Sequence, residues 1–532
     1  MKRNNSSCRL KVGKCFIYAI ASMLKEFLNK TNIINLLCFI VTAFIMYSFL
    51  QPLLKLCTPF AESLFMPYIS FIPNVGNSSI WQVFTASDHC WIIWSPIYVL
   101  TNRYLPSLLN MHPVTYFETV NSKIILCVFA LFMYAINNNF FKYFKSQICK
   151  PLFILALFPV VLTFLTSTEL QTIFCWDCWF WAYIFLPMFP IILISTAEYF
   201  YVKGENPSKH QIIVGTILLL LTAVGHEFFR FMLVLSLFIG FCLHKFFINR
   251  NLGFKKFLPA FLGITFINIL IFATRSWSEW FTRRTRIDII QIIPEYLQNF
   301  YTYILKDNAF LIGLVIAAFL AVTFLVKNES KKRLFVCETS IIISLFAFLL
   351  LIIIGQDTFQ IMLQHLGVRF LTKITLFSVF LSLMGFLIAN LCETKEKVIT
   401  LVTTIITFFP LCSLRAFFFL DSTFYIENVR SKLYMIEKAF LLNGQKNRTL
   451  YNFCPNDGAF NDQLIYYLVN NYNKGDNVNE YTIKHSNKED DEFISRSESM
   501  RKFLEKEANV TFTDEELEHP DFEMLRKIYL EQ

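Results

Sequence analysis

Long apolar runs separated by short polar segments dominate the chain between residues 31 and 420. About 20 consecutive apolar residues in an α-helix are needed to cross a hydrocarbon core roughly 30 Å thick. Gly225-His226-Glu227 interrupts one long run where a turn is expected, so that run is divided into two helices. The pattern predicts eleven transmembrane helices, at 32–56, 122–141, 151–167, 175–198, 210–224, 227–247, 256–274, 308–326, 334–354, 370–391 and 397–420.

The composition supports an all-α polytopic membrane protein. Hydrophobic residues make up 55% of the chain and the mean hydropathy is +0.49, which is more apolar than soluble domains usually are. The net charge of +9 comes largely from basic residues spread over many loops. Because these residues are not gathered with aromatic side chains on one domain, no nucleic-acid partner is indicated.

The basic residues also predict an orientation, because cytoplasmic loops carry an excess of Lys and Arg. The first 30 residues contain seven Lys or Arg residues, and Cys15–Leu24 is apolar but too short to span, which suggests an interfacial helix. Every second loop after it is basic; the loops contain Lys142, Lys203, Lys245, Lys331 and Lys395 among others. The expected location is therefore the plasma (inner) membrane, with a cytoplasmic N-terminus and residues 421–532 outside.

The segment from 421 to 532 is polar and differs in pattern from the rest of the chain. An amphipathic stretch from Tyr425 to Leu442 ends at Asn443-Gly444, a typical helix stop. A short strand is expected near 448–454, and helices near 461–472, 497–507 and 514–529. These elements predict a small α+β or helical extracytoplasmic domain, and its low apolar content suggests that it packs against the membrane part.

Candidate chemistry gathers on the predicted outer side. The long outer loop at 57–121 is rich in aromatic residues and contains Asp88-His89, and the helix break contains His226-Glu227 with Arg230 one turn later. The second large outer loop, at 275–307, and the ends of the last two spans add further cations. The acids and histidines Asp88, His89, Glu227 and His226 are the candidate catalytic residues; the candidate substrate-binding residues are Arg230, Arg275, Arg283, Arg284, Arg286, Arg369 and Arg415.

Each of these residues also has an ordinary structural explanation. Aromatic residues form interfacial belts, and basic residues reach toward lipid headgroups. Asp88 stands where it would cap a helix through Trp91 and Trp94, and Glu227 with Arg230 would form an internal ion pair. The set as a whole favours function, because arginines on the outer side oppose the positive-inside bias and suit a phosphate, which a guanidinium binds bidentately.

Asp88 lies in the loop after the first predicted span and is followed by His89. With the many spans and the outer C-terminal segment, this layout resembles the GT-C class of integral-membrane glycosyltransferases, whose acidic motif falls in the first large outer loop. The resemblance covers roughly 30–420 and implies transfer of a sugar from a polyprenyl-phosphate donor to a glycan, lipid or protein acceptor. His89 replaces the more common second acid, which leaves a divalent cation (Mg²⁺ or Mn²⁺) an open question.

Other functions are compatible with the same pattern. A polymerase or ligase of lipid-linked oligosaccharides would also use outer Arg and His residues, and a structural or assembly role needs no site. A transporter or flippase would show ionisable residues near the middle of the membrane, inverted repeats and discontinuous helices. The predicted spans are largely free of charge at their centres and show no repeat, which favours the enzyme.

Overall fold

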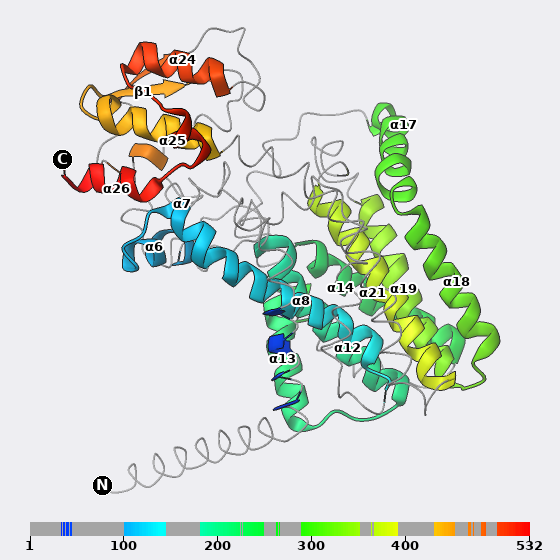
Figure 1. The fold of residues 1–532 in the computed structure, drawn as a ribbon. Coiled ribbons are helices and arrows are strands. Elements are labelled where there is room, and N and C mark those ends of the chain that lie inside the picture. Colours follow the sequence, from blue (N-terminus) through cyan, green and yellow to red (C-terminus); the bar gives the residue numbers. More distant parts are fainter. Residues whose placement is uncertain are drawn as a thin grey trace, which may run out of the picture.

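The computed structural model describes 100–144, 181–248 without 224 and 226, 289–351, 366–391, 430–452 and 497–531, together with some residues within 33–44, 262–266, 363, 467–472 and 480–485. These parts are mostly helical. Figure 1 shows a bundle of long helices with a separate small domain at one end, built from the C-terminal part of the chain. All structural statements below refer to these described residues.

The long helices match the predicted spans closely. They are α8 (Ser122–Phe141), α12 (Leu186–Lys203), α13 (Lys209–Ala223), α14 (Glu227–Ile248), α18 (Ala309–Leu325), α19 (Ser330–Leu351) and α21 (Leu366–Leu391). Five helices of the described part are long and apolar enough to cross a membrane. A sixth span results if Ile293–Lys306 and α18, which are bent by 62° relative to each other, count as one. The spans predicted at 151–167 and 397–420, and most of 32–56 and 256–274, lie outside the described residues.

Close contacts between helices form the bundle core. α14 packs on α19 with the rings of Phe228 and Phe348 5.0 Å apart. α21 approaches α8 at Gly385, where an added Cβ would meet the carbonyl oxygen of Phe140 at 2.1 Å. Glycine is required there because any side chain would push the two helices apart. The bundle therefore depends on shape as well as on hydrophobic burial.

Contacts along the helices define two ends of the bundle. α8, α12, α14, α18 and α21 run in one direction, and α13 and α19 run in the other (Figure 1). The end at which α8, α14 and α21 begin lies beside the small domain and is called the domain end. The opposite end, at which α8, α12 and α14 finish and α19 begins, is called the far end.

The small domain combines helices with two short strands. It contains a helix over 430–439, η9 (Phe440–Gly444), α24 (Ser497–Ala508), α25 (Asp514–Glu518), α26 (Phe522–Glu531) and two parallel strands, β1 (Thr449–Asn452) and β2 (Thr482–His485). β2 was not expected from the sequence. The helix expected at 514–529 is divided in two near Pro520, because proline interrupts helical hydrogen bonding.

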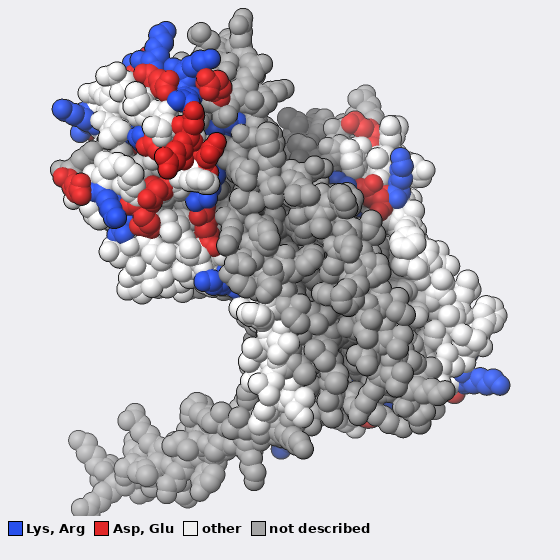
Figure 2. All heavy atoms as spheres, in the orientation of Figure 1, with Lys and Arg blue, Asp and Glu red and all other residues white. Residues whose placement is uncertain are grey.

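The start of α25 is fixed by its polar side chains. Thr513 and Glu516 form a reciprocal capping box, and Lys438 Nζ lies 2.6 Å from Glu516 Oε1. Lys and Arg alternate with Asp and Glu over the surface of this domain, whereas the described bundle helices show mostly uncharged atoms (Figure 2). This contrast is what a water-exposed domain on a lipid-embedded bundle requires.

The domain docks on helices that lie within the predicted outer loop at 57–121. There α6 (Leu105–Leu108), α7 (Pro113–Tyr116) and η2 (Phe117–Asn121) precede α8 and extend it backward. Val114 of α7 belongs to the hydrophobic core of the domain, and Arg430 Nε lies 3.0 Å from Glu118 Oε1. The expected packing of the C-terminal segment against the membrane part is therefore present in the structure.

The predicted loop at 275–307 is also helical where the structure describes it. α17 (Ile289–Asn299) and η7 (Phe300–Lys306) occupy it, and the hydroxyl of Tyr296 donates a hydrogen bond to the carbonyl oxygen of Leu349. Hydropathy alone detects segments that are apolar on all sides. It misses amphipathic helices such as α17, from which Tyr296 is buried against the bundle.

Candidate functional site

Arg230 is the most deeply placed cation at the domain end. It lies in the first turn of α14, directly after the break between α13 and α14, and only 3% of the residue is exposed. Its neighbour Phe231 stacks on Phe348, which places Arg230 level with the last turn of α19. A buried guanidinium at a helix N-terminus is costly, because it is removed from water and faces the positive end of the helix dipole.

Two more cations lie near the start of α21. Arg369 Nη2 is 2.5 Å from Asp307 Oδ2, and its guanidinium lies 5.5 Å from the centre of the Tyr303 ring. Lys373, one turn further on, is 6% exposed. Gly367 permits this arrangement, since an added Cβ would lie 2.2 Å from the ring of Tyr183 in η4 (Trp181–Phe185).

A chain of contacts shows that these cations share the domain end. Phe348 in the last turn of α19 packs on Phe228 near the start of Arg230's helix, and Phe300 of η7 packs on Phe346, two residues before Phe348. η7 leads directly into Asp307, the partner of Arg369. Cations at two helix N-termini at one end of the bundle form an environment suited to an anion, since helix dipoles and basic side chains act together.

The structure describes only part of the predicted site. Arg230 and Arg369 are brought to the same end of the bundle, and Glu227 begins α14, although its side chain is not described. Lys373, which the sequence also placed on the outer side, belongs to the same end, and so does Asp307, which was not among the predicted site residues. The predicted residues outside the described part are Asp88, His89, His226, Arg275, Arg283, Arg284, Arg286 and Arg415.

A second polar group lies at the far end and was not expected. Lys142 Nζ, at the end of α8, is 2.5 Å from Glu198 Oε2, and both side chains are 3% exposed. Tyr143 and Ser382 donate hydrogen bonds to Glu198 Oε1 at 2.5 and 2.7 Å. Glu338 of α19 interacts with Glu198 and is 1% exposed. We call Lys142, Tyr143, Glu198, Glu338 and Ser382 the buried ionic cluster.

The buried ionic cluster differs from two sequence expectations. Lys142 was assigned to a cytoplasmic loop, but it is buried at the end of α8 because Glu198 supplies an opposite charge. Glu338 lies near the start of the span predicted at 334–354 rather than at its centre, and its burial beside Glu198 was not expected. With one lysine and two carboxyl groups, this cluster is neutral only when one carboxyl carries a proton.

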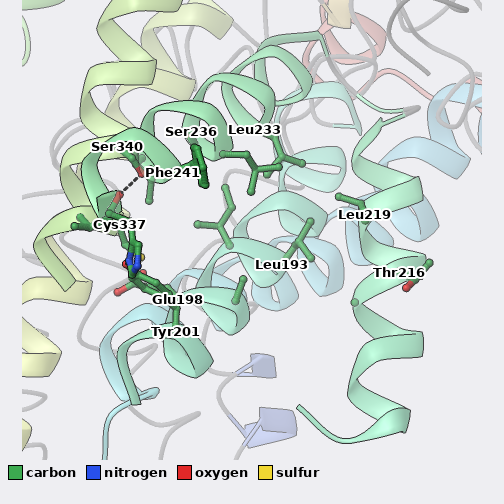
Figure 3. A pocket seen from close by; sticks show the side chains of 18 of the residues that line it. Leu193, Glu198, Tyr201, Thr216, Leu219, Leu233, Ser236, Phe241, Cys337 and Ser340 are labelled. Atoms are coloured by element: carbon green, nitrogen blue, oxygen red, sulfur yellow. Dashed lines mark hydrogen bonds between the residues drawn. The ribbon is translucent and has the colours of Figure 1, made fainter. Parts of the chain in front are cut away.

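A pocket opens beside the buried ionic cluster (Figure 3). Its volume is about 380 Å³, and α12, α13, α14 and α19 line it. Apolar side chains such as Leu193, Leu219 and Leu233 form most of the wall, and the polar residues Glu198, Tyr201 and His244 are among the residues at its far end. The pocket is therefore amphipathic along its length.

No group of three or more His, Cys, Asp or Glu side chains suited to a metal ion is found among the described residues. A cation site built on Asp88 would lie outside this part of the chain. Comparison with protein-family models, with curated proteins and with solved structures finds no match. Functional inference for this protein therefore rests on its own sequence and geometry.

Proposed function

We propose that this protein is an integral-membrane glycosyltransferase that acts at the domain end, on the outer side of the membrane. The donor is a sugar linked to polyprenyl phosphate, and the acceptor is a cell-surface glycan, lipid or protein. The observation that carries the proposal is the burial of Arg230 at the N-terminus of α14. A phosphate at this position would offset both the loss of hydration and the unfavourable dipole.

Other features of the domain end support the same reaction. Arg369 and Lys373 lie in the first two turns of α21, so a second helix N-terminus also presents positive charge. Such charge stabilises a phosphate leaving group as negative charge develops on it during transfer.

The acid–base part of the reaction is assigned to Asp88 and Glu227, with His89 and His226 beside them. An acceptor hydroxyl is a weak nucleophile, so a carboxylate must accept its proton as the bond to the sugar forms. In this proposal Asp88 accepts the proton, Glu227 completes the polar site, and the arginines bind the phosphate that departs. A divalent cation would assist if Asp88 is one of its ligands.

The test measures sugar transfer from a purified polyprenyl-phosphate sugar by the full-length protein in lipid nanodiscs. Arg230→Gln is expected to lower kcat/KM by about 10- to 100-fold, the range for losing one charge-assisted hydrogen-bonded contact. Arg448→Gln is the matched control, because that arginine forms an exposed pair with Glu480 on the C-terminal domain. Asp88→Asn should abolish transfer while leaving donor binding intact.

Absence of transfer with every lipid-linked sugar tested, by a folded and lipid-reconstituted protein, would refute the proposal. Equal activity of Arg230→Gln and Arg448→Gln would remove the phosphate-binding role of Arg230. Full activity of Asp88→Asn would show that Asp88 caps a local helix instead.

The buried ionic cluster favours a second candidate, a proton-coupled transporter or flippase. Buried ionisable groups and interrupted helices accompany transport pathways in membranes. Both features are present here, as Glu338 lies within α19 and α13 is separated from α14. The test follows a fluorescent lipid-linked sugar between the leaflets of proteoliposomes. Glu338→Gln should stop its movement, and unchanged movement, or none in the unaltered protein, would exclude this candidate.

A further inference from the structure

We propose that the pocket between α13 and the rest of the bundle binds one hydrocarbon chain of an anionic phospholipid, with the lipid headgroup at the far end. This site is separate from the proposed transfer site at the domain end. The inference rests on three observations: the shape of the pocket, the sparse contact between α13 and α14, and the charges around the pocket's far end.

The pocket has the size and the lining of a site for a hydrocarbon chain. Its volume of about 380 Å³ falls within the range typical of ligand sites. Close packing is the rule in protein interiors, so a volume of this size beside lipid is expected to be filled. Leu193, Leu219 and Leu233 come from three different helices and meet across it, as Figure 3 shows.

α13 leaves one side of the pocket accessible from the surrounding lipid. Ile212 and Thr216 line the pocket and are also exposed at the surface of the bundle, Ile212 by 53%. Gly215 lines the pocket from the same helix, and a Cβ built on it meets no atom within 4 Å. The helix is 15 residues long, and it packs on α12 while touching α14 only sparsely, so the wall is open on the α14 side. A lipid chain can therefore enter sideways, between α13 and α14.

The far end of the pocket carries positive charge. Lys245 Nζ lies 4.8 Å from the centre of the Phe241 ring, which lines the pocket. Arg333 Nη1 donates a hydrogen bond to the carbonyl oxygen of Tyr201 at 3.2 Å. Lys209 begins α13 one turn before the pocket-lining part of that helix. Basic residues at this depth attract anionic headgroups.

Polar contacts near these cations suit a headgroup rather than a second chain. The hydroxyl of Tyr201 and Nδ1 of His244 are 2.5 Å apart at the pocket's far end. Glu198 also lines the pocket, but its carboxylate is paired with Lys142. Glu205, hydrogen-bonded to Tyr199 at 3.4 Å, is the acidic residue of the exposed connection after α12. Four cations (Lys142, Lys209, Lys245 and Arg333) lie around the far end with three acids (Glu198, Glu205 and Glu338), so the charge balance favours an anionic lipid.

The test measures lipid retained by the full-length protein, using phosphatidylglycerol and phosphatidylcholine as the added probes and native mass spectrometry as the readout. The unaltered protein should retain one phosphatidylglycerol. Gly215→Phe should reduce this occupancy by about tenfold or more, since the ring fills open space in the pocket. Gly313→Phe is the matched control: Gly313 also has no atom within 4 Å of an added Cβ, but it lies on α18, away from the pocket.

The charge part is tested with Lys245→Gln combined with Arg333→Gln, which should reduce the preference for phosphatidylglycerol over phosphatidylcholine on the order of tenfold. A benzophenone amino acid at position 216 provides a second measurement, which does not depend on blocking the pocket. It should crosslink to phosphatidylglycerol in preference to phosphatidylcholine. The same group at position 313 should crosslink to both lipids equally. Equal lipid retention by the two glycine variants, or equal crosslinking of both lipids at 216, would overturn the proposal.

Discussion

Replacing Glu437 with alanine is expected to loosen the C-terminal domain from the bundle. Glu437 is fully buried, and its Oε1 accepts hydrogen bonds from His112 Nε2 at 2.8 Å and from Tyr467 at 3.1 Å, and a further one from the hydroxyl of Tyr472. Nδ1 of His112 accepts from the backbone N–H of Val114 at 3.2 Å, so the proton of the neutral ring is on Nε2, which donates to Glu437. The residue joins the domain to the start of α7.

The magnitude follows from the three donors. Each buried donor that loses its acceptor costs about 1–3 kcal/mol. His112 Nε2 and the Tyr472 hydroxyl are 3.0 Å apart and can pair with each other after the substitution, so the total is expected near the lower limit, roughly 3 kcal/mol. Glu437→Gln keeps an acceptor oxygen in place and should cost about 1 kcal/mol.

Hydrogen exchange reports this local change without requiring reversible unfolding of the whole membrane protein. Amides of the helix at 430–439 should exchange about 100-fold faster in Glu437→Ala and about fivefold faster in Glu437→Gln, while amides of α21 remain unchanged. Equal protection of 430–439 in the two variants would refute the reasoning, because it would show that the hydrogen-bonded acceptor does not hold the domain in place.

Three further predictions concern other parts of the molecule. Lys142→Met is expected to lower stability in detergent by about 3–5 kcal/mol, because it leaves Glu198 buried without its cation. Adding Glu198→Leu should restore most of the lost stability, as measured in a thermal melt. A double variant as unstable as Lys142→Met would contradict the pairing. Burial alone raises the pKa of Glu516, but its lysine ion pair and capping hydrogen bonds outweigh burial and hold that pKa below its usual value of 4.5. The stability from this pair is therefore present above pH 4.5 and is lost as the pH falls through the lowered pKa of Glu516 in the folded protein. Hydrogen exchange of α25 measured against pH should show this loss, and Glu516→Gln should remove the pH dependence. Reporter fusions at Asn443 and Lys331 should lie on opposite sides of the membrane, and a cytoplasmic signal at Asn443 would contradict the predicted topology.

The candidate site was only partly accessible to sequence analysis. The break at Gly225-His226-Glu227 indicated that Arg230 would stand at a helix start, and the structure places it there and buries it. The pairing of Arg369 with Asp307 was not foreseen, because the two residues are 62 positions apart and Asp307 lies in the turn after η7. A single sequence contains no signal for such a contact.

The sequence by itself determined the helical membrane class, the approximate bounds of the long helices that the structure describes, and the helix stop at Asn443-Gly444. Each of these follows from a local rule: a helix in lipid must be apolar over about 20 residues, and a soluble helix alternates its faces and stops at residues such as Asn-Gly. These rules act over neighbouring residues, so their pattern is visible along the chain. They hold for α8, α14, α19 and α21 alike.

The tertiary structure alone decided which polar residues meet. His112 and Glu437 are 325 residues apart, and Lys142 lies beside Glu198 only because α8 and α12 run side by side. It also decided that amphipathic segments near the domain end, such as α17, pack as helices rather than form loops. The reason is physical: burial of a charge or of one helix face depends on what the other elements supply, and that information is distributed over the whole fold.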